Sequence, residues 1–485
     1  MSILSTSIKF IRQAAVLMLL PLLAWSCQWI DEYDDETGVD ESPKYINITI
    51  SVSAGNNAPT RAPEGGEYGD GVEKGLAREN QVNSITLIFY QDNTGINTSS
   101  DNAVVACVKN YAVRPYTNND LPNSHTHKTG ETSSVQDNEV LYTTGDQKLE
   151  DTQLVIGQSY KMLVVANASA NVSVGEKIKD VRDKLTSSVY TGSGAGIDAT
   201  DFVMTSETDA TVSLVNPTID TSTGENRFIY YFDCIHIERL AARIDYCTKG
   251  ATYAADYQGY KYNVGSTDDD GFYVVTMVTP FNLYNESEYL FKRVQDAWPA
   301  TSTTYLGDES KTNYVVDPKT EHKDNGETVV SYLSPIVENM NNDYSVTLSN
   351  LSEGQTFISG GFNNVIIAYP RENTLMPSSY LKKYATGLAF EVKYYASASA
   401  TPVTRVYYHY LRHQGEKETG SYPAKLWADL SDTETGSSTV SMNHGIVRNN
   451  IYRVSIESFS DVDGTIKINI EEKHWRHVDN PTIYI

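Results

Sequence analysis

The sequence is short of positive charge. Its 485 residues include 38 Lys and Arg against 62 Asp and Glu, which gives a net charge of −24 and a pI near 4.7. Proteins bind nucleic-acid phosphates with Lys and Arg, which displace the counterions of the polymer. The charge balance therefore argues against nucleic acid as a partner, and the excess of acidic residues favours solubility outside the cell.

Cysteine is also scarce, and no two cysteines have the spacing of metal ligands. The four are Cys27, Cys107, Cys234 and Cys247. Cys234 and Cys247 lie on neighbouring expected strands and could form one disulfide. The alternative is that they are small buried hydrophobic side chains.

Motifs of catalysis and cofactor binding are missing. The chain has no Gly-rich phosphate loop, nucleophile elbow, His-Glu-x-x-His pair or paired Cys-x-x-Cys. His125 and His127 lack a nearby third metal ligand, and we interpret them as loop histidines. The segments 268–271 and 461–464 are rich in Asp but miss the EF-hand pattern, so we interpret them as solvated turns. We expect no enzyme activity, cofactor or metal.

Long hydrophobic runs are absent except near the start. Residues 14–25 form an apolar run of twelve after Lys9 and Arg12, long enough for a signal peptide and too short to span a bilayer. The run ends at Ser26-Cys27, which resembles a lipobox. We predict that residues 1–26 are a signal peptide and that Cys27 carries lipid. The alternative is an ordinary signal peptide with an incidental cysteine.

An acidic block follows the cysteine. Five of the six residues 31–36 are Asp or Glu, a composition that stays solvated. Residues 27–44 are therefore predicted to be a lipid-anchored tether. The block resembles the signal that sorts some lipoproteins to the outer face of the outer membrane; a plain flexible tether is the alternative.

What the sequence has in abundance is the composition and alternation of β-structure, including 34 Tyr. Residues 45–53 place Ile46, Ile48, Ile50 and Val52 on one face and polar residues on the other, which predicts a half-buried strand. Residues 54–80 are rich in Gly, Asn, Pro and Glu without any periodicity, which predicts an exposed, mobile loop.

Short strands separated by turn residues continue through the chain and predict an all-β fold of β-sandwiches. Helices are expected only at 175–185 and near 286–298 and 379–386. We place a first domain at 45–238 and a second at 239–485. Near the end, Ile466, Ile468 and Ile470 alternate with polar residues, and Ile483 and Ile485 share a face. Tyr394, Tyr395 and the tyrosines of 407–410 fit either a sugar-stacking platform or ordinary sheet packing.

Several segments together resemble the fimbrillin superfamily, the lipoprotein-derived subunits of type V pili, and its minor-fimbrillin branch most. They follow one another along almost the whole chain. They are the lipobox at Cys27, the early strand followed by Thr60-Arg61-Ala62, Phe202–Ser206, Glu238–Ile244, Tyr422–Asp429 and Ile446–Tyr452.

The resemblance implies two transthyretin-like β-sandwich domains with a few short helices. It also implies proteolytic maturation between Arg61 and Ala62, with Arg78 as an alternative site, and polymerisation by strand exchange. The implied partners are identical or related pilus subunits, the outer membrane through the lipid, and host or bacterial surface ligands. The implied location is the cell outer membrane and then the fimbrium, where the subunit supports adhesion.

Strand exchange also has a physical basis. A sandwich that loses the strand 45–53 exposes unpaired backbone groups and an apolar groove, which accept an extended segment by β-augmentation. We predict that residues 465–485 are the donor, through Ile466, Ile468, Ile470, Ile483 and Ile485. The alternative is that these residues complete their own sheet. A monomeric adhesin or glycan-binding lipoprotein, an anchor or tip subunit and a surface hydrolase are the other function classes.

Overall fold

The protein is described by a computed structural model. The described residues are 42–52, 72–73, 75–91, 103–116, 141–192, 198–206, 209–281, 283, 287–295, 303–305, 314–315, 346–351, 354–373, 385–411, 422–429, 445–460 and 465–475. Cys27, Arg61, Ala62, Ile483 and Ile485 lie outside them, as do His125, His127 and the segment 461–464.

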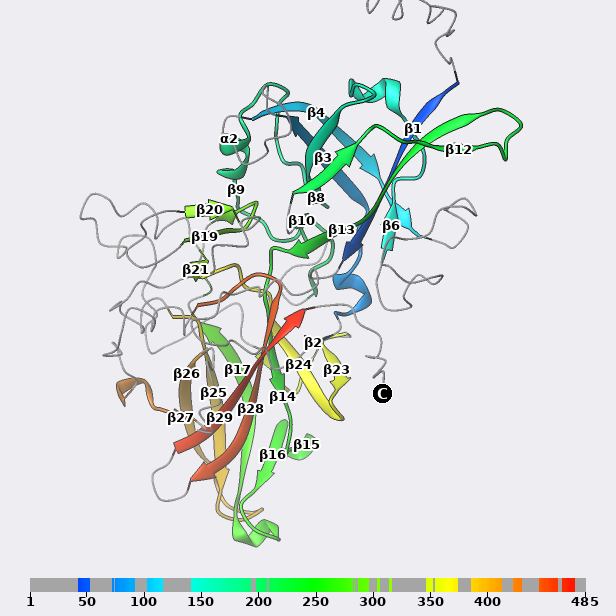
Figure 1. Cartoon of the computed structure of the whole chain (residues 1–485). Helices are drawn as coiled ribbons and strands as arrows, with labels where there is room; N and C mark the ends of the chain where they lie inside the picture. The colour runs from blue at the N-terminus through cyan, green and yellow to red at the C-terminus, as the bar shows by residue number, and fades with distance from the viewer. Residues whose placement is uncertain are drawn as a thin grey trace, which may run out of the picture. The chain divides into compact units, whose positions relative to one another are not determined.

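The fold is all-β, as the alternation predicts (Figure 1). The one α-helix in the described ranges is α2 (Ile178–Arg182), which lies within the predicted helix 175–185 and buries Ile178 and Val181. Single 3₁₀ turns occur at η1 (Ala77–Glu79), η2 (Leu149–Thr152), η4 (Ala255–Tyr257), η5 (Asp268–Asp270) and η7 (Trp427–Asp429). No helix in this part of the chain is long and apolar enough to cross a membrane.

The largest sheet has 11 strands and draws all of them from residues 44–239. Its main path runs β4-β3-β8-β10-β13-β1-β6-β5, while β11 pairs with β8, β12 with β13 and β7 with β1. The strands are β1 (Lys44–Val52), β3 (Ser84–Gln91), β4 (Val104–Ala112), β5 (Arg114–Pro115), β6 (Leu141–Thr143), β7 (Gln147–Lys148), β8 (Ser159–Ala166), β10 (Met204–Ser206), β11 (Ala210–Ser213), β12 (Thr218–Asp220) and β13 (Arg227–Arg239).

Two further sheets come almost wholly from residues after 242. The 7-stranded sheet has the path β2-β29-β28-β14-β24-β23, with β27 on β29; the 6-stranded sheet has the path β15-β16-β17-β25-β26, with β22 on β17. The strands of the first are β2 (Val72–Glu73), β14 (Arg243–Cys247), β23 (Thr356–Ser359), β24 (Phe362–Ala368), β27 (Tyr422–Ala424), β28 (Asn450–Ser460) and β29 (Thr465–Trp475). Those of the second are β15 (Thr252–Ala254), β16 (Gly259–Asn263), β17 (Phe272–Phe281), β22 (Val346–Thr347), β25 (Gly387–Tyr395) and β26 (Val403–Tyr410).

The remaining strands are short. β18 (Glu288–Tyr289) pairs with β9 (Leu185–Thr186), and β19 (Arg293–Gln295) pairs with β20 (Thr303–Tyr305) and β21 (Tyr314–Val315). The helix expected near 286–298 is therefore wrong over its described residues, 287–295, which contain β18, β19 and non-helical residues between them. The apolar residues Tyr289, Leu290 and Phe291 are buried without forming a helical face, and of the three Tyr289 alone lies in a strand.

Two compact units emerge from the packing, and each is described by itself. The small one comprises residues 1–44 and 219–228. In it the Arg227 guanidinium lies 3.2 Å from Asp220, and the Phe228 N–H donates to the Pro43 carbonyl. The large one comprises residues 45–218 and 229–485 and contains two hydrophobic cores. Ile48, Leu87 and Leu163 belong to the first core, and Ile244, Phe390 and Ile468 to the second.

Candidate functional site

The first predicted site residues lie on β1, an interior strand of the 11-stranded sheet. It runs between β13 on one side and β6 with β7 on the other (Figure 1). Its register pairs Ile50 with Tyr142 of β6 and Ile46 with Gln147 of β7. Since β1 is bonded on both edges, its removal would leave unpaired N–H and C=O groups on β13 and on β6.

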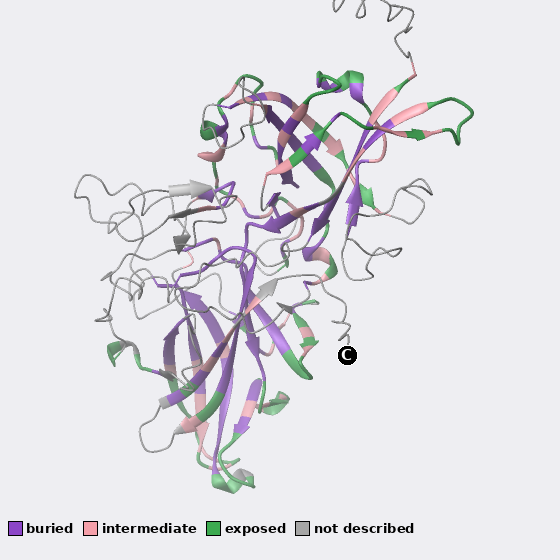
Figure 2. Cartoon of the chain, viewed as in Figure 1, coloured by how far each residue is buried: buried purple, intermediate pink, exposed green. Residues whose placement is uncertain are grey.

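The apolar face of β1 is completely enclosed. Ile46, Ile48, Ile50 and Val52 are each no more than 1% exposed and belong to the first core (Figure 2). Burial of one such side chain is worth about 1.5–3 kcal/mol, so the four contribute about 6–12 kcal/mol. The strand therefore occupies an apolar slot that would require another apolar strand if β1 left.

The opposite face of β1 departs from the expectation of a half-buried strand, because it is buried too. Thr143, at the end of β6, and the residues after it supply polar partners for Asn47 and for the backbone of β1. The Asn47 amide donates to Asp146 at 2.9 Å and accepts from the Thr143 hydroxyl at 2.9 Å, while the Ile48 N–H donates to the Thr144 hydroxyl at 3.1 Å. These bonds satisfy polar groups that burial would otherwise penalise.

The predicted donor residues Ile466, Ile468 and Ile470 lie on β29, within the chain's own 7-stranded sheet. β29 pairs with β28 from Thr465 opposite Ser460 to His474 opposite Asn450, and it also pairs with β27 and β2. The three isoleucines are at most 2% exposed and lie in the second core. In this single chain these three residues complete their own sheet; the other two predicted donor residues, Ile483 and Ile485, lie outside the described residues.

The predicted loop 54–80 has structure at its end. Residues 72–73 form β2, Glu79 at the end of η1 is 0% exposed, and Asn80, which follows η1, is also buried. The Glu79 carboxylate accepts from the Leu76 N–H at 2.6 Å and closes the turn. Sequence composition could not show this, because the partner that holds Glu79 in place lies 164 residues away.

That partner belongs to a buried cluster of charges, which we call the Arg239–Arg243 cluster. Arg243 bonds Glu79 at 2.9 Å and binds Asp245 through two bonds of 2.9 Å. Arg239 donates to the Glu79 carbonyl at 2.9 Å and to the Asn449 amide oxygen at 3.0 Å. All five residues are 0% exposed.

The surroundings of the Arg239–Arg243 cluster set its electrostatics. Burial lowers the pKa of Arg239 to about 10, against the opposing effect of Glu79. The pKa of Arg243 is raised, because Asp245 and Glu79 outweigh the effect of its burial. Arg243 and Arg453, the latter at 3.4 Å, thus share the Asp245 carboxylate, and Arg243 also bonds that of Glu79. The charges on an otherwise apolar run, 238–245, were the signal in the sequence that could have located this cluster.

A second buried cluster lies around Arg448, which bonds Glu372 at 2.8 Å. Next to it, Glu288 is 0% exposed; one carboxylate oxygen accepts from the Glu372 N–H at 3.0 Å, and the other has no partner among the described residues. Burial raises the pKa of Glu288 to about 8, although Arg448 opposes the shift.

This raised pKa predicts a pH dependence of stability. Between the ordinary value of 4.5 and about 8, the folded protein holds a proton on Glu288 that the unfolded chain releases. The contribution of Glu288 to stability therefore falls as the pH rises through this window. The side chain of Glu288→Gln cannot ionise. Between pH 5 and pH 8.5 the free energy of unfolding of the natural protein should therefore fall relative to that of the variant, by at least about 1.4 kcal/mol, the value of one pKa unit. Urea unfolding at both pH values measures it; a constant difference would show that Glu288 does not titrate there.

Other candidate residues have structural surroundings. Cys107 and Cys247 are buried free thiols, which fits small hydrophobic side chains and not a disulfide at Cys247; the side chain of Cys234 is outside the description. Asp270 accepts from the Thr267 N–H and hydroxyl at 2.9 and 3.0 Å, the pattern of a local turn. Tyr394 and Tyr395 pack on Tyr273 and Phe272 and so form no open platform.

Comparison with known proteins gives similarity only at the level of solved structures. No family model and no curated protein sequence matches the chain. A fimbrilin from Porphyromonas gingivalis is similar at 13% identity and a TM-score of 0.38, over 91% of this chain and 99% of its own. The tip fimbrial protein Mfa3 of the same organism is similar at 11% identity and a TM-score of 0.35, over 89% and 100%. All these TM-scores lie below 0.5, so the fold described above rests on this chain's own strands and register.

Proposed function

We propose that the chain is a structural subunit of a bacterial surface fimbria, exported as a lipoprotein on Cys27 and polymerised by strand exchange with identical or related subunits. The observation that carries the proposal is the position of β1: an interior strand, buried on both faces, immediately followed by the segment that contains Arg61. A cut in that segment frees β1 from the rest of the chain. The vacated slot then accepts a donor strand from a neighbour.

The contacts of Arg78 favour Arg61 as the cut site. Arg78 lies in η1, where its guanidinium donates to the Gly354 carbonyl at 3.0 Å and to the Tyr369 hydroxyl at 3.3 Å. Proteases cut exposed, extended segments, and η1 would have to unfold to present Arg78. A cut after Arg61 leaves β2 and η1 attached to the body of the subunit.

The two-domain division belongs to the same proposal. We place the boundary between Glu238 and Arg239, near the end of β13, the last strand along the chain that joins the 11-stranded sheet; β14, which begins at Arg243, belongs to the 7-stranded sheet. The first domain then provides the slot of β1. The second provides the chain end that follows β29, in which Ile483 and Ile485 have the spacing of a donor. The proposed location is the outer membrane before maturation and the fimbrium afterwards, in support of adhesion.

The proposal predicts the N-terminus of the polymerised subunit. Surface polymers should begin with Ala62-Pro63-Glu64, and Arg61→Ala should leave a lipid-bearing chain that begins at Cys27 and stays unpolymerised. Arg78→Ala is the matched control and should mature normally. N-terminal sequencing and lipid labelling measure both. Recovery of surface chains that begin only at Cys27 would contradict the stalk function. It would support an anchor subunit or a monomeric adhesin, which keeps β1.

A further inference from the structure

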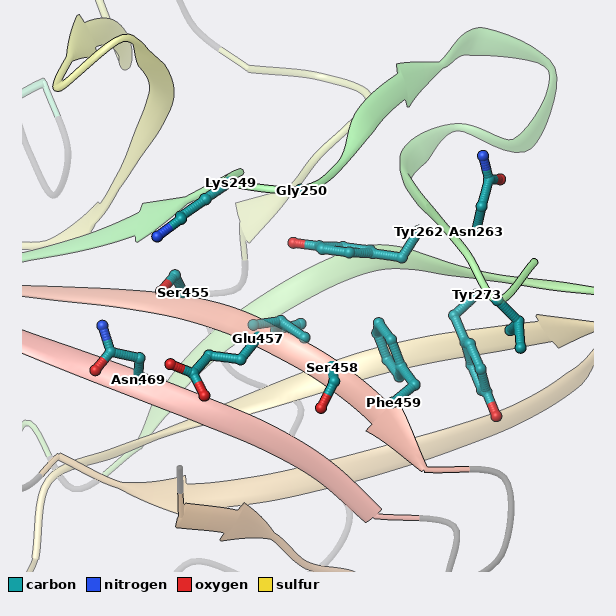
Figure 3. A pocket seen from close by; sticks show the side chains of 12 residues that line it. Lys249, Gly250, Tyr262, Asn263, Tyr273, Ser455, Glu457, Ser458, Phe459 and Asn469 are labelled. Carbon is teal, nitrogen blue, oxygen red and sulfur yellow. The ribbon is translucent and has the colours of Figure 1, made fainter. Parts of the chain in front are cut away.

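A pocket of about 490 Å³ is lined by residues in or next to strands of the 7-stranded and 6-stranded sheets, none of which belongs to β1 or to either charge cluster (Figure 3). It opens where β28 and β29 of the 7-stranded sheet face β16 and β17 of the 6-stranded sheet. Its volume is in the range of sites for small organic ligands. The apolar part of its wall consists of Tyr262, Tyr273 and Phe459, together with Ile456 and Val264.

The aromatic wall is held rigidly. The rings of Tyr273 and Phe459 are stacked with centroids 4.2 Å apart, and Tyr262 meets Phe459 edge to face at 5.2 Å. The Tyr262 hydroxyl is fixed by a bond of 2.6 Å to the Tyr246 hydroxyl. The wall is therefore in place before any ligand arrives, which limits the entropy cost of binding.

The polar part of the wall differs from a packed interior, because its side chains make no hydrogen bond or ion pair in the described part of the chain. They offer donors and acceptors together: an ammonium, a carboxylate, two hydroxyls and two amides. These side chains are Lys249, Asn263, Ser455, Glu457, Ser458 and Asn469. Ser455 is only 7% exposed and has its Cα directly across the ladder from that of Asn469, so both side chains project on the same side of the sheet.

A β-bulge positions the carboxylate. The register of β28 against β29 shifts between Ile456 and Ser458, which leaves Glu457 without a partner on β29. A bulge redirects a side chain that a regular strand would place elsewhere, and bulges are common beside functional sites. Figure 3 shows Glu457 and Asn469 on the strands opposite Lys249 and Tyr262.

We infer that this pocket binds an uncharged saccharide unit. A sugar has apolar C–H groups for the apolar side chains of the wall and hydroxyls that donate and accept for the polar ones. A strongly anionic ligand would face Glu457 and a cationic one Lys249, so a neutral ligand satisfies the pocket best. The site gives the subunit a means of adhesion that does not depend on strand exchange.

The test uses the purified full chain on an array of neutral saccharides with terminal galactose, N-acetylgalactosamine, N-acetylglucosamine, mannose or fucose, beside sialylated and sulfated probes. The strongest neutral probe is then titrated and followed by saturation-transfer NMR. Glu457→Ala and Asn469→Ala should each weaken its binding at least tenfold. Lys467→Ala, on the same face of β29 but outside the pocket lining, should leave binding unchanged.

Because Glu457 is exposed and Asn469 is half-buried, both variants should keep the melting temperature of the natural protein, which separates lost binding from lost folding. Absence of any neutral-saccharide signal would overturn the inference. So would binding restricted to acidic probes, or a loss in Lys467→Ala equal to that in Asn469→Ala.

Discussion

Glu79→Ala is expected to lower the free energy of unfolding by about 3–5 kcal/mol, the usual cost of breaking a buried ion pair from one side. Glu79 is one of the two carboxylates that bond Arg243, and the second, Asp245, also bonds Arg453. Without it, the buried Arg243 guanidinium keeps its bonds to Asp245 but loses its second carboxylate. The variant also loses the bond that closes η1 at Leu76. Urea unfolding followed by circular dichroism measures the loss.

Two further variants show whether charge is the cause. Glu79→Gln keeps the size of the side chain and a hydrogen-bond acceptor for Leu76, so it should lose less stability than Glu79→Ala but still be clearly destabilised. Glu150→Ala removes a carboxylate from an exposed pair with Lys148 and should leave the unfolding midpoint unchanged. Equal stability of Glu79→Ala and the natural protein would show that η1 and its carboxylate are not part of the folded core.

The strands of this fold could be predicted from local pattern to the extent that each had one apolar face. β1 shows both the success and its limit. The alternation of Ile46, Ile48 and Ile50 predicts the strand and its buried face. That its polar face is buried as well depends on Thr143 and Asp146, nearly one hundred residues further along the chain. A periodicity of two reports which residues share a face, and it does not report what covers the other.

The charge clusters could not be predicted for a related reason. Glu79 stands in a stretch whose composition is that of a loop, and it becomes buried only because Arg239 and Arg243 approach it from β13 and β14. Isolated charges within an apolar run indicate that partners must exist, since an unpaired buried charge is too costly. They do not identify those partners. The pocket at Glu457 likewise depends on a bulge, which has no signature in the alternation of β28.

Loss of the residues after Trp475 should abolish polymerisation without unfolding the subunit, whereas a charge placed in the buried face of β29 should destabilise the subunit itself. Deletion of residues 476–485 should leave a folded subunit that no longer polymerises, since it removes Ile483 and Ile485 but no residue of β29. Ile468→Asp should instead destabilise the subunit itself by several kcal/mol, because a carboxylate would enter the second core unpaired. Lys467→Asp is the matched control. Its side chain is exposed, and both folding and polymerisation should persist.

Two measurements separate these outcomes. Thermal unfolding of the unpolymerised chain reports whether β29 still completes its sheet, and the detergent-resistant ladder of the mature polymer on a gel reports donation. The deletion should change only the ladder, and Ile468→Asp should lower the unfolding temperature before any ladder can form. If the deletion of 476–485 polymerised normally while Ile468→Asp folded normally and abolished the ladder, β29 itself would be the donated strand. The partner of β28 in the polymer would then have to come from elsewhere, since its ladder with β29 extends from Asn450 to Ser460.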